Sequence, residues 1–184
     1  MRVLGWAAAG IAATMVASCA TPMTAGADFA QDVDLMKYGT FTWGEADGLP
    51  VGDPRLDNNP FFTDRLHAAI QGELESRNIR EDDSAPALLV HHHTSVRNHI
   101  EVYEADLTAG YSSEEYGAGT QVVEYDEGTF LVDIADAETK EILWRGWAVT
   151  NVDAALNDPE EMTSLMKRAV ALMFERFPVP PTGS

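Results

Sequence analysis

The chain has very few cysteines and few basic residues. Cys19 is the only cysteine among 184 residues, so no disulfide can form within the chain. The 12 lysines and arginines stand against 30 acidic residues, which gives a formal net charge of −18. Such an acidic surface repels phosphate backbones, and we therefore expect no nucleic-acid partner.

Recognisable enzyme motifs are also missing. The sequence contains neither GxSxG nor HExxH, and Gly117-Ala118-Gly119 lacks the third glycine of a phosphate-binding loop. The adjacent acids Asp82-Asp83 and Glu114-Glu115 fall in expected loops, where solvent prevents the separated pKa values that acid–base catalysis requires. We therefore expect no enzymatic activity, no catalytic residue and no cofactor.

The N-terminal apolar stretch, residues 3–16, is shorter than the roughly 20 residues that a transmembrane helix needs. Arg2 precedes it, and the small residues Ala17 and Ser18 follow it. A positive start, a short apolar segment and small residues are the three parts of a secretory signal. The sequence therefore predicts a signal peptide over residues 1–18.

Cys19 completes the motif Val16-Ala17-Ser18-Cys19, which fits the lipobox of bacterial lipoproteins. We expect Cys19 to be acylated, because buried acyl chains contribute about 0.8 kcal/mol per CH₂ group and two or more chains hold a protein firmly on a membrane. Cleavage near Ala17 to give an ordinary secreted protein is the alternative. Ala20 follows the cysteine, which favours the periplasmic face of the outer membrane of a Gram-negative bacterium. Residues 19–27 are interpreted as the anchor and a short tether.

Behind the tether we expect a single α+β domain over residues 28–180 and a tail over residues 181–184. One amphipathic helix is predicted over residues 60–77, with Asn59 as its cap. The other has Asp158 as its cap, and its apolar stripe extends to Phe177. Asn78 is expected to close the first helix in a left-handed conformation, so that Ile79 folds back toward Leu74.

One short β-prone run precedes the first predicted helix, and five more lie between the two helices in the sequence. They lie at residues 38–43, 87–96, 100–103, 121–125, 129–134 and 142–150. The last two flank a polar turn, whose centre places Asp133 opposite Arg145. The order of elements predicts a two-layer sandwich, with a mainly antiparallel sheet and both helices packed on one face. We expect the run Trp144-Arg145-Gly146-Trp147 in the core, with Gly146 allowing a helix to approach closely; a binding platform is the alternative.

Three consecutive histidines, His91-His92-His93, form the most conspicuous local pattern. On a strand, His91 and His93 point to one side and His92 to the other. Two imidazoles at that spacing could share a metal ion if a third ligand came from a neighbouring strand. The alternative interpretation is a solvent-facing strand whose histidines are satisfied by water, and on that interpretation the chain has no metal site.

Several segments together resemble the lipoproteins of the domain of unknown function 4136. They are Tyr38-Gly39-Thr40-Phe41-Thr42-Trp43, Glu127 to Asp133, Asp136 to Lys140, Leu143 to Gly146, and Phe177-Pro178. The resemblance covers roughly residues 28–180 and implies a bacterial envelope lipoprotein with no established activity. This chain departs from the family in its strongly acidic segment 104–127.

We expect a membrane-tethered, non-enzymatic envelope lipoprotein that acts through protein contacts. Its partners would be the membrane, through the covalent lipid on Cys19, and an envelope protein whose identity the sequence does not reveal. The alternative is a small-ligand or metal-binding module that uses His91 and His93.

Overall fold

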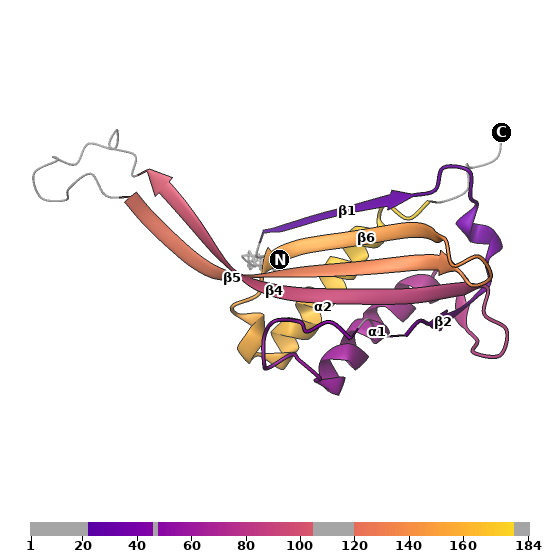
Figure 1. The fold of residues 1–184 in the computed structure, drawn as a ribbon, viewed down its shortest axis with the longest axis horizontal. Coiled ribbons are helices and arrows are strands. Elements are labelled where there is room, and N and C mark those ends of the chain that lie inside the picture. The colour runs from indigo at the N-terminus through magenta and orange to yellow at the C-terminus, as the bar shows by residue number, and fades with distance from the viewer. Residues whose placement is uncertain (1–21, 46–47, 105–119, 179–184) are drawn as a thin grey trace, which may run out of the picture.

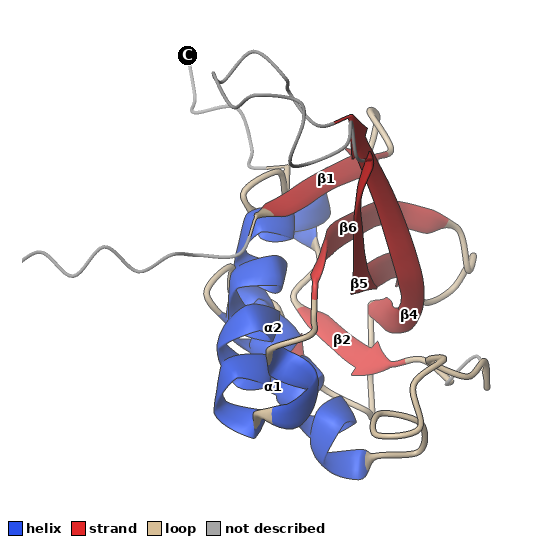
Figure 2. Ribbon diagram, turned by 90° about the vertical axis from the view of Figure 1, so that its left-hand side faces the viewer, coloured by secondary structure: helices blue, strands red, loops and turns tan. Residues whose placement is uncertain are grey.

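The structure, a computed structural model, describes residues 22–45, 48–104 and 120–178. Six strands form one sheet in the order β1-β6-β5-β4-β2-β3. They are β1 (Met23–Phe29), β2 (Thr40–Trp43), β3 (Arg80–Glu81), β4 (Leu88–Glu104), β5 (Thr120–Asp136) and β6 (Ile142–Asn151). Pairing is antiparallel except where β2 meets β3 and β4. The helices α1 (Pro60–Glu75) and α2 (Pro159–Phe174) cover one face (Figure 2), which confirms the α+β sandwich.

α1 begins as the sequence predicts, but it ends at Glu75, two residues before the predicted end at residue 77. The Asn59 carboxamide oxygen accepts hydrogen bonds from the main-chain N–H groups of Phe61 and Phe62, at 3.1 and 3.3 Å. Asn78 adopts a left-handed conformation with φ of 64°. The Ile79 N–H then donates to the carbonyl of Leu74 at 3.0 Å, and both side chains are buried. These local caps explain why the helix could be located from sequence alone.

The second helix begins as predicted but ends earlier. Asp158 accepts hydrogen bonds from the N–H groups of Glu160 and Glu161, at 2.9 and 3.1 Å. The helix stops at Phe174, whereas the apolar stripe was expected to continue to Phe177. Phe177 follows in a turn and stacks on Phe174, with ring centroids 5.4 Å apart. The apolar spacing therefore persists because the turn folds back onto the core.

The two tryptophans of β6 lie on opposite faces of the sheet. Trp144 is fully buried beneath α2, where its ring contacts Phe174. Trp147 is 37% exposed, so the prediction that the whole run lies in the core is wrong for this residue. Strand alternation explains the difference, because residues an odd number of positions apart face opposite ways. A Cβ atom on Gly146 would lie 3.0 Å from the Cβ of Met173, which confirms the close helix approach.

The expected tether, residues 19–27, is wrong from Met23 onward. Residues 23–29 form β1, which pairs antiparallel with β6 at the edge of the sheet. Small residues suggested a flexible segment, but here they suit a strand beneath a large side chain. A Cβ atom on Gly26 would lie 2.7 Å from Cε2 of Trp147, so only glycine fits under that indole.

β4 and β5 form one long hairpin rather than a set of short strand pieces. Their pairing runs without interruption from Leu88 opposite Asp136 to Glu104 opposite Thr120. The separate strands expected at residues 100–103 and 121–125 belong to this ladder. Residues 98–104 and 120–126 extend past the rest of the sheet as a two-stranded arm (Figure 1). Much of the acidic segment 104–127, residues 105–119, lies outside the described residues.

Candidate functional site

The sequence placed His91 and His93 on one side of a strand, and the structure does so. Both belong to the side of β4 that faces away from the helices, which we call the open face. The His91 ring packs against Gly44, and its Nδ1 lies 3.4 Å from the carbonyl oxygen of Glu45. His93 pairs across the sheet with Leu131.

Asp133, which lies opposite His91 in the ladder between β4 and β5, already accepts hydrogen bonds from another residue. Asp133 lies opposite His91 on one side and Arg145 on the other, which confirms the predicted register of the last hairpin. Arg145 donates two hydrogen bonds of 2.6 Å to the two carboxylate oxygens of Asp133. Within residues 22–45, 48–104 and 120–178, no group of three or more histidine, cysteine, aspartate or glutamate side chains could hold a metal ion. A third ligand for His91 and His93 is therefore not found among these residues.

His92 faces the helices and takes part in a stack of rings. The Trp43 indole lies parallel to the His67 imidazole, with centroids 3.6 Å apart, and His67 meets His92 edge-on at 4.8 Å. Burial, and then the neighbouring His92, lower the pKa of His67 to about 4, although Asp64 acts in the opposite direction. His67 is therefore neutral near pH 7, and its ring packs between Trp43 of β2 and His92 of β4.

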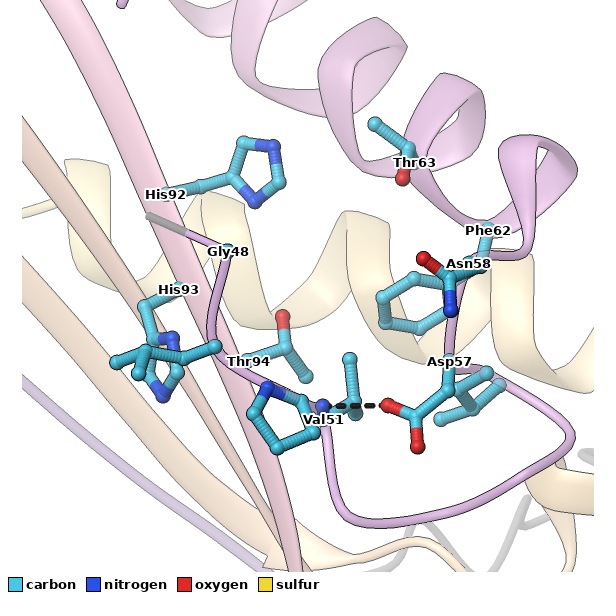
Figure 3. A pocket seen from close by; sticks show the side chains of 12 residues that line it. Gly48, Val51, Asp57, Asn58, Phe62, Thr63, His92, His93 and Thr94 are labelled. Atoms are coloured by element: carbon cyan, nitrogen blue, oxygen red, sulfur yellow. Dashed lines mark hydrogen bonds between the residues drawn. The ribbon is translucent and has the colours of Figure 1, made fainter. Parts of the chain in front are cut away.

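A pocket of about 330 Å³ lies next to this stack (Figure 3). Its walls come from the loop after β2, from the start of α1 and from β4. The apolar side is formed by Leu49, Pro50, Val51, Leu56 and Phe62, and the polar side by Asp57, Asn58, Thr63, His92 and Thr94. Gly48 and His93 complete the lining.

Long-range bonds fix the loop that closes the pocket. The carbonyl of Val51 accepts from the N–H of Val96 at 2.7 Å, and the N–H of Val51 donates to Asp57 at 2.6 Å. Gly52 has a φ of 93°, and a Cβ atom there would lie 2.7 Å from the carbonyl oxygen of Val96. Asp53 is buried and accepts hydrogen bonds from Arg55, which holds the pKa of Asp53 below its usual value. The pocket is therefore formed in advance of any ligand.

On the open face, Trp147 and Arg145 of β6 are exposed. Trp147 pairs across the sheet with Leu131 on one side and Gly26 on the other. Arg145, two residues earlier, has a side chain that is 46% exposed. Asp28 of β1 lies opposite Arg145 on the side away from Asp133. The Trp147 indole thus lies next to a row of alternating charges formed by Asp28, Arg145 and Asp133.

Sequence reasoning missed both the pocket and the ring stack. Alternation along β4 already placed His92 on the same face as Leu88 and Val90, which was the one available signal for the stack. Its contact with His67 depends on how α1 crosses the sheet, and no local pattern encodes that. Cys19, the predicted acylation site, lies outside the described residues.

The family comparison now identifies the chain. The family described as "Domain of unknown function (DUF4136)" matches residues 26–179. The chain belongs to this family. No curated protein matches the sequence.

Among solved structures, the chain is similar to a PDZ domain protein from Parabacteroides distasonis, with 16% identity and a TM-score of 0.53. That match covers 89% of this chain but only 38% of the other, so this DUF4136 domain spans well under half of that protein's length. A PelC dodecamer from Paraburkholderia phytofirmans matches at 9% identity and a TM-score of 0.44, with 83% of this chain and 98% of the other covered. At 16% identity, the likeness to the PDZ domain protein concerns the fold alone.

Proposed function

We propose that this DUF4136 protein is a lipid-anchored, non-enzymatic protein of the bacterial cell envelope that binds another protein through its open face. The observation that carries the contact is the pair Trp147 and Arg145, exposed side by side at the centre of a sheet face that neither helix covers. Tryptophan and arginine are enriched among the residues that dominate binding between proteins.

The charges around this pair support recognition by a protein. Asp133 holds the Arg145 guanidinium from one side, so the arginine is ordered before binding and loses less side-chain entropy. Trp147 lies over Gly26 and beside Leu131, which gives the centre an apolar surface. An apolar centre with a charged rim is the usual anatomy of an interface between proteins.

The proposed anchor sets the distance between the domain and the membrane. β1 begins at Met23, four residues after Cys19. A linker of four residues spans at most about 14 Å when fully extended. A lipid on Cys19 would therefore hold the sheet next to the bilayer, within reach of other proteins at the same membrane surface. No helix in the described part of the chain is long and apolar enough to cross a membrane.

Site-specific photocrosslinking in cells tests this proposal. A photoreactive amino acid at position 149, on the same face of β6 as Trp147, is expected to give one discrete protein adduct in the otherwise native anchored protein. The same amino acid at position 61 is the control, because Phe61 is 67% exposed but belongs to α1 on the other face. The adduct at 149 should weaken in an Arg145→Ala background. Equal adducts from both positions, or none from 149, would contradict binding through the open face.

A further inference from the structure

The pocket beside β4 occupies a place where the sheet lacks a strand. β2 ends at Trp43, after which the N–H of Gly44 still donates to the carbonyl of Val90 at 2.8 Å. The next main-chain hydrogen bond between β4 and the described part of the loop joins Val96 to Val51. The pocket lies between these two bonds, beside residues 92–94 of β4.

Thr94 lies on β4 between Val90 and Val96, the residues that make these two bonds. The main-chain groups of Val90 and Val96 point toward the loop, and alternate residues of a strand direct these groups to the same edge. The N–H and carbonyl of Thr94 therefore point there too. No main-chain hydrogen bond joins Thr94 to residues 44–45 or 48–59 of the loop. The strand thus presents a donor and an acceptor in the position where a neighbouring strand would pair.

The Thr94 side chain adds a third polar group. The residue is only 4% exposed, and its hydroxyl oxygen has no hydrogen-bond partner among the residues that the structure describes. Figure 3 shows this side chain between His92 of β4 and Phe62 of α1. A buried hydroxyl without a partner is costly, so a group that bonds to it on binding removes that cost.

The rest of the lining favours an uncharged ligand. Among the described residues that line the pocket, Asp57 is the only carboxylate, and it already accepts the N–H of Val51. An anion would meet this carboxylate and a strongly acidic chain. Phe62 and Leu56 provide an apolar wall, while Thr63 and Asn58 provide neutral polar groups. The combination suits a molecule with one apolar substituent and neutral hydrogen-bonding groups.

We propose that this pocket binds a small uncharged amide, whose amide group pairs with the main chain and hydroxyl of Thr94 and whose apolar substituent contacts Phe62. The amide takes the place of one residue of the missing strand. The pocket volume of about 330 Å³ is near the lower end for ligand sites, which limits the occupant to a small molecule.

Binding of N-acetylvaline N-methylamide to the full chain in detergent micelles, followed by ¹⁵N NMR, tests the proposal. Saturable shifts are expected at Thr94 and Thr63. Thr94→Val should weaken binding about three- to tenfold, because one hydrogen bond is lost, and Thr94→Ser should restore it. Thr129→Val, on the open face of β5, is the matched control and should bind normally.

Urea unfolding shows whether the Thr94→Val variant is folded, and its midpoint is expected to equal or exceed that of the wild type. Localised shifts that do not saturate, or equal affinity in Thr94→Val, would overturn the proposal. Equal binding of zwitterionic free valine would overturn the requirement for an uncharged amide. A blocked five-residue valine-alanine peptide should bind at least tenfold more weakly, and tighter binding would show that the occupant is a peptide segment instead.

Discussion

The indole of Trp43 lies flat on the imidazole of His67, with ring centroids 3.6 Å apart and ring planes within 4° of each other. The His92 ring meets the His67 imidazole edge-on, with ring centroids 4.8 Å apart. Partial burial at this packed position disfavours the charged imidazole and lowers the pKa of His67 to about 4. A histidine whose pKa is lowered by folding links the stability of the fold to pH.

Acidification should therefore destabilise the protein through His67. Unfolded His67 takes up a proton near pH 6.5, whereas folded His67 does so only near pH 4. The contribution of neutral His67 to the free energy of unfolding is fully present above pH 6.5 and is lost as the pH falls toward 4. Because the side chain is only partly buried, we expect a loss of about 1 kcal/mol between pH 7 and pH 5.

Urea unfolding of the wild type and of His67→Phe at both pH values isolates this effect, since the many carboxylates contribute equally to both proteins. The wild type should lose more unfolding free energy than the variant on acidification. Identical pH dependence in the two proteins would show that His67 is not responsible.

Truncation of the two tryptophans of β6 should have different effects on stability and on partner binding. Trp144→Ala removes a fully buried ring and is expected to cost about 3–5 kcal/mol of unfolding free energy. Trp147→Ala removes a partly exposed ring and should cost about 1 kcal/mol, while abolishing the photocrosslink to the proposed partner from a neighbouring position such as Val149. Thermal unfolding and crosslinking of both variants check this, and a Trp147→Ala protein that unfolds like Trp144→Ala would refute the assignment of faces.

Gly146 should not tolerate even a methyl group. A Cβ atom there would lie 2.8 Å from Cζ2 of Trp144 and 3.0 Å from the Cβ of Met173. We expect Gly146→Ala to lower the unfolding free energy by about 1–3 kcal/mol. Gly72→Ala is the matched control, because nothing lies within 4 Å of that position and alanine should stabilise α1 by about 0.5–1 kcal/mol. If both substitutions have the same sign in urea denaturation, the packing of α2 on β6 is not as described.

Arg77 joins the ends of the two helices. Its guanidinium donates to the carbonyl of Phe174 at 2.9 Å and to the carboxylate of Glu73 at 2.7 Å, and it lies over the Phe174 ring at 5.1 Å. Lysine cannot make these contacts together, so Arg77→Lys should cost about 1–2 kcal/mol. Arg80→Lys, on an exposed position of β3, should cost almost nothing in the same urea titration. A neutral effect at both positions would mean that the Arg77 contacts do not stabilise the protein.

Local signals account for the parts of the fold that the sequence predicts. Asn59 and Asp158 begin helices because their side chains cap nearby N–H groups, and such patterns span only three residues. The turn before β6 likewise fixes the register that brings Asp133 to Arg145. These features depend on neighbours in the chain, so they can be read without the tertiary structure.

The missed features depend on residues far apart in sequence. The centre of β1 is made of small residues, and the segment becomes a strand because β6 offers an edge and Trp147 covers Gly26. The pocket exists because Val51 bonds to Val96, 45 residues later, which directs an otherwise irregular loop along β4. The bond between Arg77 and Phe174 spans 97 residues. Composition and periodicity carry no information about such pairings.

The lipid anchor on Cys19 is the central claim, and cell fractionation with a clickable palmitate analogue tests it most directly. The wild-type protein should be found in the membrane fraction and should carry the label. Cys19→Ala should lose both the label and the membrane association while keeping the thermal unfolding midpoint of the domain, because Cys19 precedes the first strand. An unlabelled wild-type protein, or a Cys19→Ala variant that remains in the membrane fraction, would contradict the anchor.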